Sequence, residues 1–212
     1  MRIEAFEAGP LPTNCYFLTD EATGKTAVID PGAYDSQIQR AAQSHDVAMV
    51  LLTHGHFDHI MGVGDLVART GAKVYLDAAD AAMVRDPRQN LSGVMRLGAV
   101  KPFTPDVLLH DGDTFPLGSL RIRVLHTPGH TPGGCCYLAE DALFSGDTLM
   151  GGSAGRTDFP GGDYRALLAS LQKLKALPGD WRVFPGHGPE STLDWERRNN
   201  PYLEPERYGL TT

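Results

Sequence analysis

The chain has 212 residues, enough for one domain with a substantial core, and a net charge of −7 without a basic run. Nucleic acid and anionic membrane surfaces are therefore not expected as partners, and no apolar run approaches the roughly 18 residues of a membrane-spanning helix. Residues 1–7 lack a signal-peptide core, and the three cysteines form no disulfide framework, so we expect a cytoplasmic protein.

The first half of the chain predicts short strands interrupted by helices. Apolar runs bounded by proline and glycine predict strands at residues 3–8, 15–19, 26–30, 47–52 and 73–76. Helical spacing predicts helices over residues 36–44 and 60–70, and Asp77 can cap a third over 78–84. Residues 86–106 contain three prolines and no clear period. They predict a long loop or loosely helical insert, which either forms one wall of a site or simply connects elements.

The second half of the chain also predicts short strands interrupted by helices. Alternating apolar and polar residues predict a half-exposed strand at 120–126, and a hairpin follows at 135–138 and 142–145. A leucine stripe predicts a helix over 164–176, followed by a strand at 181–184 and a short helix at 191–199. Strands that outnumber helices and come in hairpins favour an α/β protein with two sheets faced by helices.

A cluster of histidines and aspartate follows the strand at 47–52. His54, His56, Asp58 and His59 lie within six residues, in the loop that leaves the strand. His54 and His56 project to the same side of an extended segment, whereas Asp58 and His59 can diverge as the chain turns into a helix. Imidazoles and a carboxylate suit zinc and similar divalent metals, so each pair could serve one ion. The alternative is a polar surface turn.

The segment Thr53-His54-Gly55-His56-Phe57-Asp58-His59 resembles the H-x-H-x-D-H signature of the metallo-β-lactamase fold superfamily. Three later turns fit the same resemblance, because each follows an apolar run and places a histidine or aspartate beside glycine. The resemblance implies an αββα sandwich of two mixed sheets flanked by helices. It also implies two sets of metal ligands and a bridging residue: His54, His56 and His130 for the first ion; Asp58, His59 and His187 for the second; Asp147 between them.

Two divalent ions are the cofactors that this ligand set implies, with zinc expected and iron or manganese as alternatives. Two ions roughly 3.5–4 Å apart can lower the pKa of a water between them and polarise the carbonyl under attack. Asp58 and Asp147 are the candidate catalytic residues, since either carboxylate could orient the water or accept its proton. Two ions (+4) with Asp58, Asp147 and a hydroxide (−3) leave about +1, which favours a small anionic substrate.

Within the superfamily, the chain most resembles the small glyoxalase II-type hydrolases, through residues 155–163, 185–193 and 200–203. This resemblance implies cleavage of a small thioester such as S-lactoylglutathione by metal-bound hydroxide. Only 25 residues follow His187 (212 − 187), so we expect one domain over residues 1–212 without the C-terminal helical glutathione-binding domain. Arg156 is the candidate substrate-binding residue, since it could bind a carboxylate bidentately. Alternatively, Arg156 pairs with Asp158 or Asp163 to fix its loop.

Other members of the superfamily remain open as alternatives. The Gly155-Arg156-Thr157-Asp158-Phe159 segment also resembles persulfide dioxygenases, which bind one iron, although the tail around His187 favours the hydrolases. A lactonase would use the same seven ligands. A β-lactamase is disfavoured, because those enzymes are exported and lack the bridging aspartate. Loss of a ligand would have indicated a non-enzymatic metal-binding module, and none is lost. We interpret Cys135 and Cys136 as buried strand residues rather than a redox pair.

Overall fold

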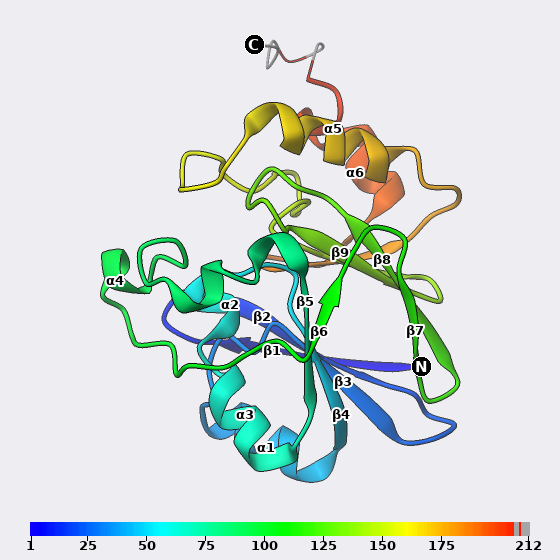
Figure 1. Cartoon of the computed structure of the whole chain (residues 1–212). Helices are drawn as coiled ribbons and strands as arrows, with labels where there is room; N and C mark the ends of the chain where they lie inside the picture. The colour runs from blue at the N-terminus through cyan, green and yellow to red at the C-terminus, as the bar shows by residue number, and fades with distance from the viewer. Residues whose placement is uncertain (206–207, 209–212) are drawn as a thin grey trace.

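The computed structural model describes residues 1–205 and 208; the last part of the predicted domain, 206–207 and 209–212, lies outside the described residues. Two six-stranded mixed sheets lie face to face, and helices cover the outer face of each (Figure 1). The αββα sandwich predicted from the sequence is therefore confirmed.

The first sheet has the strand order β1-β2-β3-β4-β5-β6. Its strands are β1 (Arg2–Ala8), β2 (Thr13–Thr19), β3 (Lys25–Ile29), β4 (Asp46–Leu51), β5 (Lys73–Asp77) and β6 (Val107–Leu109). The first three strands pair antiparallel, and β3 to β6 pair parallel. Helix α1 (Ser36–Ser44) makes the crossover from β3 to β4, and the Asp35 carboxylate caps it by accepting from two backbone N–H groups.

The second sheet has the order β12-β11-β10-β9-β8-β7. Its strands are β7 (Thr114–Leu117), β8 (Leu120–His126), β9 (Cys135–Ala139), β10 (Ala142–Gly146), β11 (Arg182–Pro185) and β12 (Ser191–Thr192). Strands β10 and β11 are parallel and are joined through helix α5 (Tyr164–Lys175), as β3 and β4 are joined through α1. The two sheets thus repeat one arrangement.

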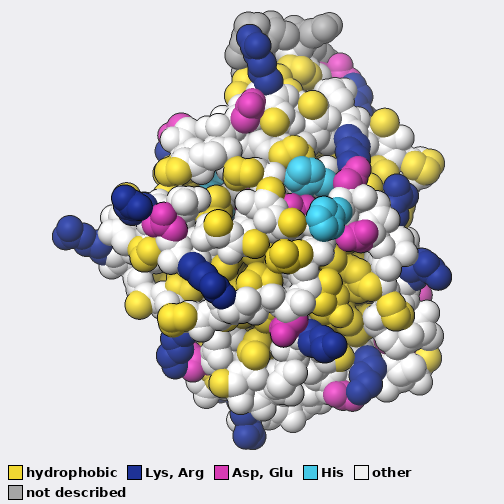
Figure 2. All heavy atoms as spheres, viewed as in Figure 1, with side chains coloured by type: hydrophobic (Ala, Val, Ile, Leu, Met, Phe, Trp, Pro, Cys, Tyr) yellow, Lys and Arg dark blue, Asp and Glu magenta, His cyan; other side chains and the backbone are white. Residues whose placement is uncertain are grey.

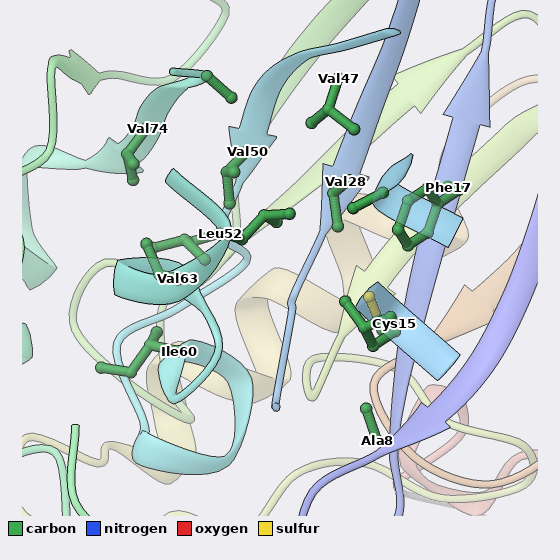
Figure 3. Packing of buried hydrophobic residues seen from close by; sticks show 14 of the residues in the cluster. Ala8, Cys15, Phe17, Val28, Val47, Val50, Leu52, Ile60, Val63 and Val74 are labelled. Carbon is green, nitrogen blue, oxygen red and sulfur yellow. The ribbon is translucent and has the colours of Figure 1, made fainter. Parts of the chain in front are cut away.

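Three apolar clusters hold these layers together. One lies between the sheets and includes Tyr16, Tyr137 and Phe144. A second packs α1 and α3 (Val63–Thr70) on the first sheet, where Phe17, Val28 and Val50 face the helices (Figure 3). The third packs the leucine stripe of α5 and helix α6 (Leu193–Asn199) on the second sheet. Cys135 and Cys136 are buried in β9, as interpreted from the sequence, and burial raises the pKa of both thiols.

Two predicted helices differ from the structure. The expected helix over residues 60–70 is divided between α2 (Phe57–Ile60) and α3, and between them Gly62 N–H donates to the Pro31 oxygen at 2.8 Å instead of to a helical carbonyl. The backbone at Gly62 packs so closely against residues 31–33 that a Cβ on Gly62 would lie 2.4 Å from the Ala33 oxygen. The expected helix over 78–84 is instead two short 3₁₀ turns, Ala78–Asp80 and Met83–Arg85. The buried Asp80 side chain bonds to distant loops rather than to its own turn.

Candidate metal centre

Strand direction brings the predicted ligand loops to one edge of the sandwich. Strands β8, β10 and β11 run the same way, since β9 pairs antiparallel with both β8 and β10 and β11 pairs parallel with β10. The loops after these strands therefore meet at one end of the second sheet. Two backbone hydrogen bonds join this end to the first sheet: Cys135 N–H donates to the Thr53 oxygen (2.9 Å), and Asn14 N–H donates to the Gly186 oxygen (2.7 Å).

The first predicted set of ligands forms a buried group. His54, His56 and His130 each offer one ring nitrogen, and these atoms lie within 4.8 Å of one another. His56 Nδ1 is 2.9 Å from His130 Nε2, too close for two lone pairs without a proton or cation between them. All three residues are at most 5% exposed. Such a cluster of histidines suits a borderline divalent ion.

The second predicted set lies beside the first. Asp58, His59 and His187 also place one donor atom each within 4.8 Å of one another. His187 Nε2 is 3.2 Å from Asp58 Oδ2, and His59 Nε2 is 3.7 Å from the same oxygen. Because Asp58 and His59 both belong to α2, the short helix turns one of its ends into the site.

Asp147 lies between the two groups. Its Oδ2 is 3.4 Å from His130 Nε2 of the first group and 3.7 Å from His187 Nε2 of the second, and its Oδ1 is 3.5 Å from His59 Nε2. Gly186 permits this approach, because a Cβ there would lie 2.3 Å from Asp147 Oδ1. The structure thus brings all seven predicted ligands together, with the Asp147 carboxylate between the two groups.

Several buried polar atoms of this cluster have no hydrogen-bond partner among the residues that the structure describes, which is unusual in a protein interior. These atoms are His54 Nε2, His56 Nε2, His59 Nε2 and Asp147 Oδ1. All belong to predicted ligands, and their nitrogen and carboxylate-oxygen character fits zinc or iron. The donor set therefore fits a metal centre.

Acceptors outside the cluster hold the opposite nitrogen of four of the histidines. The Nδ1 atoms of His59, His130 and His187 lie 2.7–2.9 Å from Asp30 Oδ2, the Arg156 oxygen and the Pro12 oxygen. Since carboxylate and carbonyl oxygens only accept, each Nδ1 carries the hydrogen and each Nε2 faces the centre. His54 Nδ1 donates to Thr53 Oγ1, which itself donates to Asp30 Oδ2. Such partners orient ligand imidazoles in metal sites.

Two of the carboxylates that organise the site were missed by the sequence reasoning. Asp30, at the end of β3, holds both His59 and Thr53, and it takes a positive φ of 49° to do so. Asp80 is fully buried and accepts from Gly55 N–H (2.9 Å), Thr131 Oγ1 (2.8 Å) and Gly133 N–H (2.6 Å). It thereby joins the loop of His54 and His56 to the loop of His130. The parallel pairing of β3 and β4 could have indicated Asp30; no local signal marks Asp80.

The two imidazoles of the H-x-H segment are neutral without metal. Burial lowers the pKa of His54 well below its usual range and that of His56 to about 3, and the His130 imidazole lowers both further. Neutral imidazole is the form that binds metal ions, so these side chains are ready to bind at neutral pH.

The second group is charged without metal. Burial alone would lower the pKa of His59, but the carboxylates of Asp58, Asp147 and Asp30 outweigh it and raise this pKa to about 10. Burial alone would raise the pKa of Asp58, but His59 and His187 outweigh it and lower this pKa. A cation bound at this group would therefore displace a proton from His59.

A cavity of about 490 Å³ opens onto the metal centre. Five predicted ligands line it, together with Arg156 and eight residues without charge. The Arg156 guanidinium donates to both carboxylate oxygens of Asp158, at 2.6 Å each, and lies 4.1 Å above the Phe159 ring. The structure thus shows the predicted pairing of Arg156 with Asp158, in a position from which Arg156 also reaches the cavity.

The remaining histidines lie outside the cluster. His45 Nδ1 is 2.7 Å from the Ala41 oxygen, and His126 Nε2 is 2.9 Å from the Pro132 oxygen, so both serve local structure. On the face drawn in Figure 2, basic and acidic side chains are interspersed. Over residues 1–205 and 208, no helix has the length and apolar character that crossing a membrane requires.

The chain belongs to the metallo-beta-lactamase superfamily. A family model of this superfamily matches residues 8–187, a range that includes all seven predicted ligands. The match confirms the superfamily predicted from the sequence.

Curated relatives cover nearly the whole chain. It is 39% identical over 206 residues to an uncharacterized protein of Aquifex aeolicus, which covers 95% of this chain and 97% of the relative. It is 34% identical to the probable metallo-hydrolase YqgX of Bacillus subtilis, and 31% identical to the hydroxyacylglutathione hydrolase GloC of Haemophilus influenzae. Each of these two comparisons covers 96% of this chain and 98% of the relative. An enzyme of the metallo-hydrolase type follows from these relatives.

Solved structures agree on the fold. BLEG-1, a B3 metallo-beta-lactamase, superposes with a TM-score of 0.89 at 34% identity, covering 95% of this chain and 99% of that one. TTHA1623 in a di-iron-bound form gives 0.84 at 36% identity over 94% and 100% of the two chains. ETHE1 from Myxococcus xanthus gives 0.79 at 29% identity over 100% and 92%. The similarity to a di-iron form agrees with a metal-binding fold and leaves the metal of this chain open.

Proposed function

We propose that this protein is a hydrolase with two divalent metal ions, zinc expected, that cleaves a small thioester of the S-lactoylglutathione type. One observation carries the proposal: two groups of metal-ligating side chains share Asp147 and open onto one cavity. The similarity to the hydroxyacylglutathione hydrolase GloC supports the choice of a thioester.

The ions would be held by His54, His56 and His130, and by Asp58, His59 and His187, with Asp147 between them. When bound, they would supply an activated water and polarise the substrate carbonyl. The reaction adds the water oxygen to the carbonyl carbon and breaks the carbon–sulfur bond, and one water proton ends on the departing thiol. The chain must therefore orient a water and move its proton.

Asp58 is suited to orienting the water. Its lowered pKa keeps the carboxylate ionised at neutral pH, so Oδ2 can accept a hydrogen bond from the water, whereas the same lowering makes it a weak base for the proton itself. Asp147 Oδ2 lies between the two histidines His130 and His187 and can orient the water from the other side. Arg156 lines the cavity and could hold an anionic group of the substrate, at the expense of its pairing with Asp158.

The test is hydrolysis of S-lactoylglutathione by the purified, metal-loaded protein. We expect turnover that stops with a chelator, returns when zinc is added back, and is absent in Asp147→Asn. A fully loaded protein that leaves thioesters intact would refute the proposal.

A second candidate is a persulfide dioxygenase with one iron, favoured by the resemblance of residues 155–159 to that branch of the superfamily. It predicts oxygen consumption with glutathione persulfide by the iron-loaded protein. Nitrocefin should be included as a third substrate, because BLEG-1 is a metallo-beta-lactamase. The seven ligands alone do not separate these activities, so the assays are run side by side on one preparation.

A further inference from the structure

We infer that the cavity beside the metal centre holds an apolar acyl group, so that the preferred substrate is a thioester of an aliphatic acid rather than of a small hydroxy acid. The inference rests on the thioesterase function proposed above. It concerns which acyl group this enzyme selects, and it follows from the side chains around the cavity and from one segment that borders it.

The cavity offers almost no polar side chain beyond the predicted ligands. Its polar lining consists of His56, Asp58, His130, Asp147 and His187, which the metal centre uses, and of Arg156, which pairs with Asp158 and is proposed above to hold the anionic group of the substrate. The other lining residues carry no hydrogen-bonding side chain: Leu11, Phe57, Leu91, Met95, Met150, Ala154, Gly155 and Phe159. A hydroxyl group on the acyl chain would therefore find no free side-chain partner there, whereas methylene groups would leave water.

Two of these apolar residues come from the flap, which we define as residues 86–98. It contains the short helix α4 (Ser92–Met95), which lies at the left edge of the molecule in Figure 1, below the loop that leads into α5. Leu91 is buried, whereas Met95 is 38% exposed although it lines the cavity. Apolar surface of this kind is covered when an apolar ligand binds. The flap thus forms one wall of the cavity, one of the two roles considered for this region from the sequence.

The flap is fixed to the metal-binding loop. The Asn90 backbone oxygen accepts from Phe57 N–H at 2.8 Å, directly between His56 and Asp58. The Asn90 side chain accepts from Ser92 N–H and donates to the Val84 oxygen. Leu91 takes a positive φ of 69°, an uncommon conformation for leucine that is retained where structure or ligand binding requires it. The apolar wall is therefore held in a set position relative to His56 and Asp58.

The decisive experiment is a series of S-acylglutathiones from acetyl through butanoyl and hexanoyl to octanoyl, hydrolysed by the metal-loaded protein. Burial of each methylene predicts a rise in kcat/KM of about two- to fourfold until the cavity is full. S-lactoylglutathione is expected to be a poorer substrate than the butanoyl ester. The Met95→Ser variant should reduce the rise per methylene. Val94→Ser is the matched control: Val94 belongs to the same helix and is 62% exposed, but it does not line the cavity.

Binding gives a second readout that needs no turnover. The thioether S-hexylglutathione should bind the metal-free protein more tightly than S-methylglutathione in calorimetry, and Met95→Ser should reduce the difference. Hydrolysis at equal kcat/KM along the series would overturn the inference and leave the thioesterase function standing. If no thioester is cleaved, the proposed function fails, and the two thioethers then decide on the cavity: equal binding overturns the apolar site, and tighter hexyl binding supports it.

Discussion

Replacing Asp80 by asparagine should weaken metal binding indirectly, because the hydrogen bonds of Asp80 hold the loops that carry the predicted ligands. Its two oxygens accept from Gly55 N–H and Gly133 N–H, and also from Thr131 Oγ1. Asparagine keeps one oxygen and puts an NH₂ group in place of the other. Whichever way the amide turns, one of the two backbone N–H groups faces a donor. The Thr131 hydroxyl can rotate and adapt.

The expected loss of stability follows from the one N–H group that loses its acceptor. One buried N–H without a partner costs about 1–3 kcal/mol. Burial raises the pKa of Asp80, so the carboxylate is itself costly to bury, and asparagine recovers part of that cost; we expect the lower half of the range. For a chain of this size, the metal-free protein should melt about 2–8 °C lower. Since Gly55 stands between His54 and His56, metal affinity should fall about 10- to 100-fold.

The assay is competition for zinc between a chromophoric chelator and the metal-free protein, with thermal melts of the same samples. Asp77→Asn is the matched control, because Asp77 is also buried and its pKa is also raised by burial, but it accepts only from Ala79 N–H. Asparagine keeps the one oxygen that the Asp77 cap needs, so we expect Asp77→Asn to keep stability and zinc affinity near those of the wild type and Asp80→Asn to lower both. Equal zinc affinity in the two variants would refute the positioning role of Asp80.

The remaining predictions concern the ligands, the cavity and pH. His54→Ala and Asp147→Ala should each abolish turnover and lower the metal content measured by atomic spectroscopy; a variant with full turnover would contradict the two-metal site. If Arg156 binds substrate, Arg156→Ala should raise KM for an acidic thioester more than it lowers kcat, and Asp158→Ala should lower KM; unchanged kinetics in both leave a structural role. Removing metal present at about 100 times its Kd should lower the melting temperature by about 5–10 °C, and no change would argue against tight binding. A backbone N–H of the β7–β8 turn and neighbouring hydroxyls lower the pKa of Asp20 to about 2. Because this pKa is depressed on folding, the stability difference between wild type and Asp20→Asn should be complete above about pH 4 and disappear as the pH falls through about 2; a difference independent of pH would contradict it.

The sequence predicted those parts of the fold and site that depend on local pattern. Alternation in residues such as Leu120, Ile122 and Val124 marks one buried face of β8, and all three side chains are buried. The turns with His130 and Asp147 could be found because each follows an apolar run. The assignment of ligands to two ions came from the family resemblance, and spacing alone did not supply it.

What the sequence could not predict depends on contacts between distant segments. The helix break at Gly62 arises from close approach to Ala33, which periodicity within residues 60–70 cannot reveal. Asp30 and Asp80 are both separated by long stretches of chain from the loops that they hold, and each looks locally like an ordinary turn residue or cap. The sequence allowed two interpretations of Arg156, as a substrate-binding residue or as the partner of a nearby aspartate. The structure shows the ion pair with Asp158, which lies only two residues away in the chain.

Each group of ligands draws on both sheets. His54 and His56 follow β4 of the first sheet, whereas His130 follows β8 of the second; Asp58 and His59 are likewise completed by His187 after β11. Neither half of the chain could therefore assemble a complete ion site by itself. Bound metal would link the two halves of the chain and stabilise their association. A complete metal site would form only after the two sheets have docked. If the chain is cut between β6 and β7, neither fragment alone should bind zinc at this site. Zinc binding by the mixed fragments would therefore measure their reassembly directly.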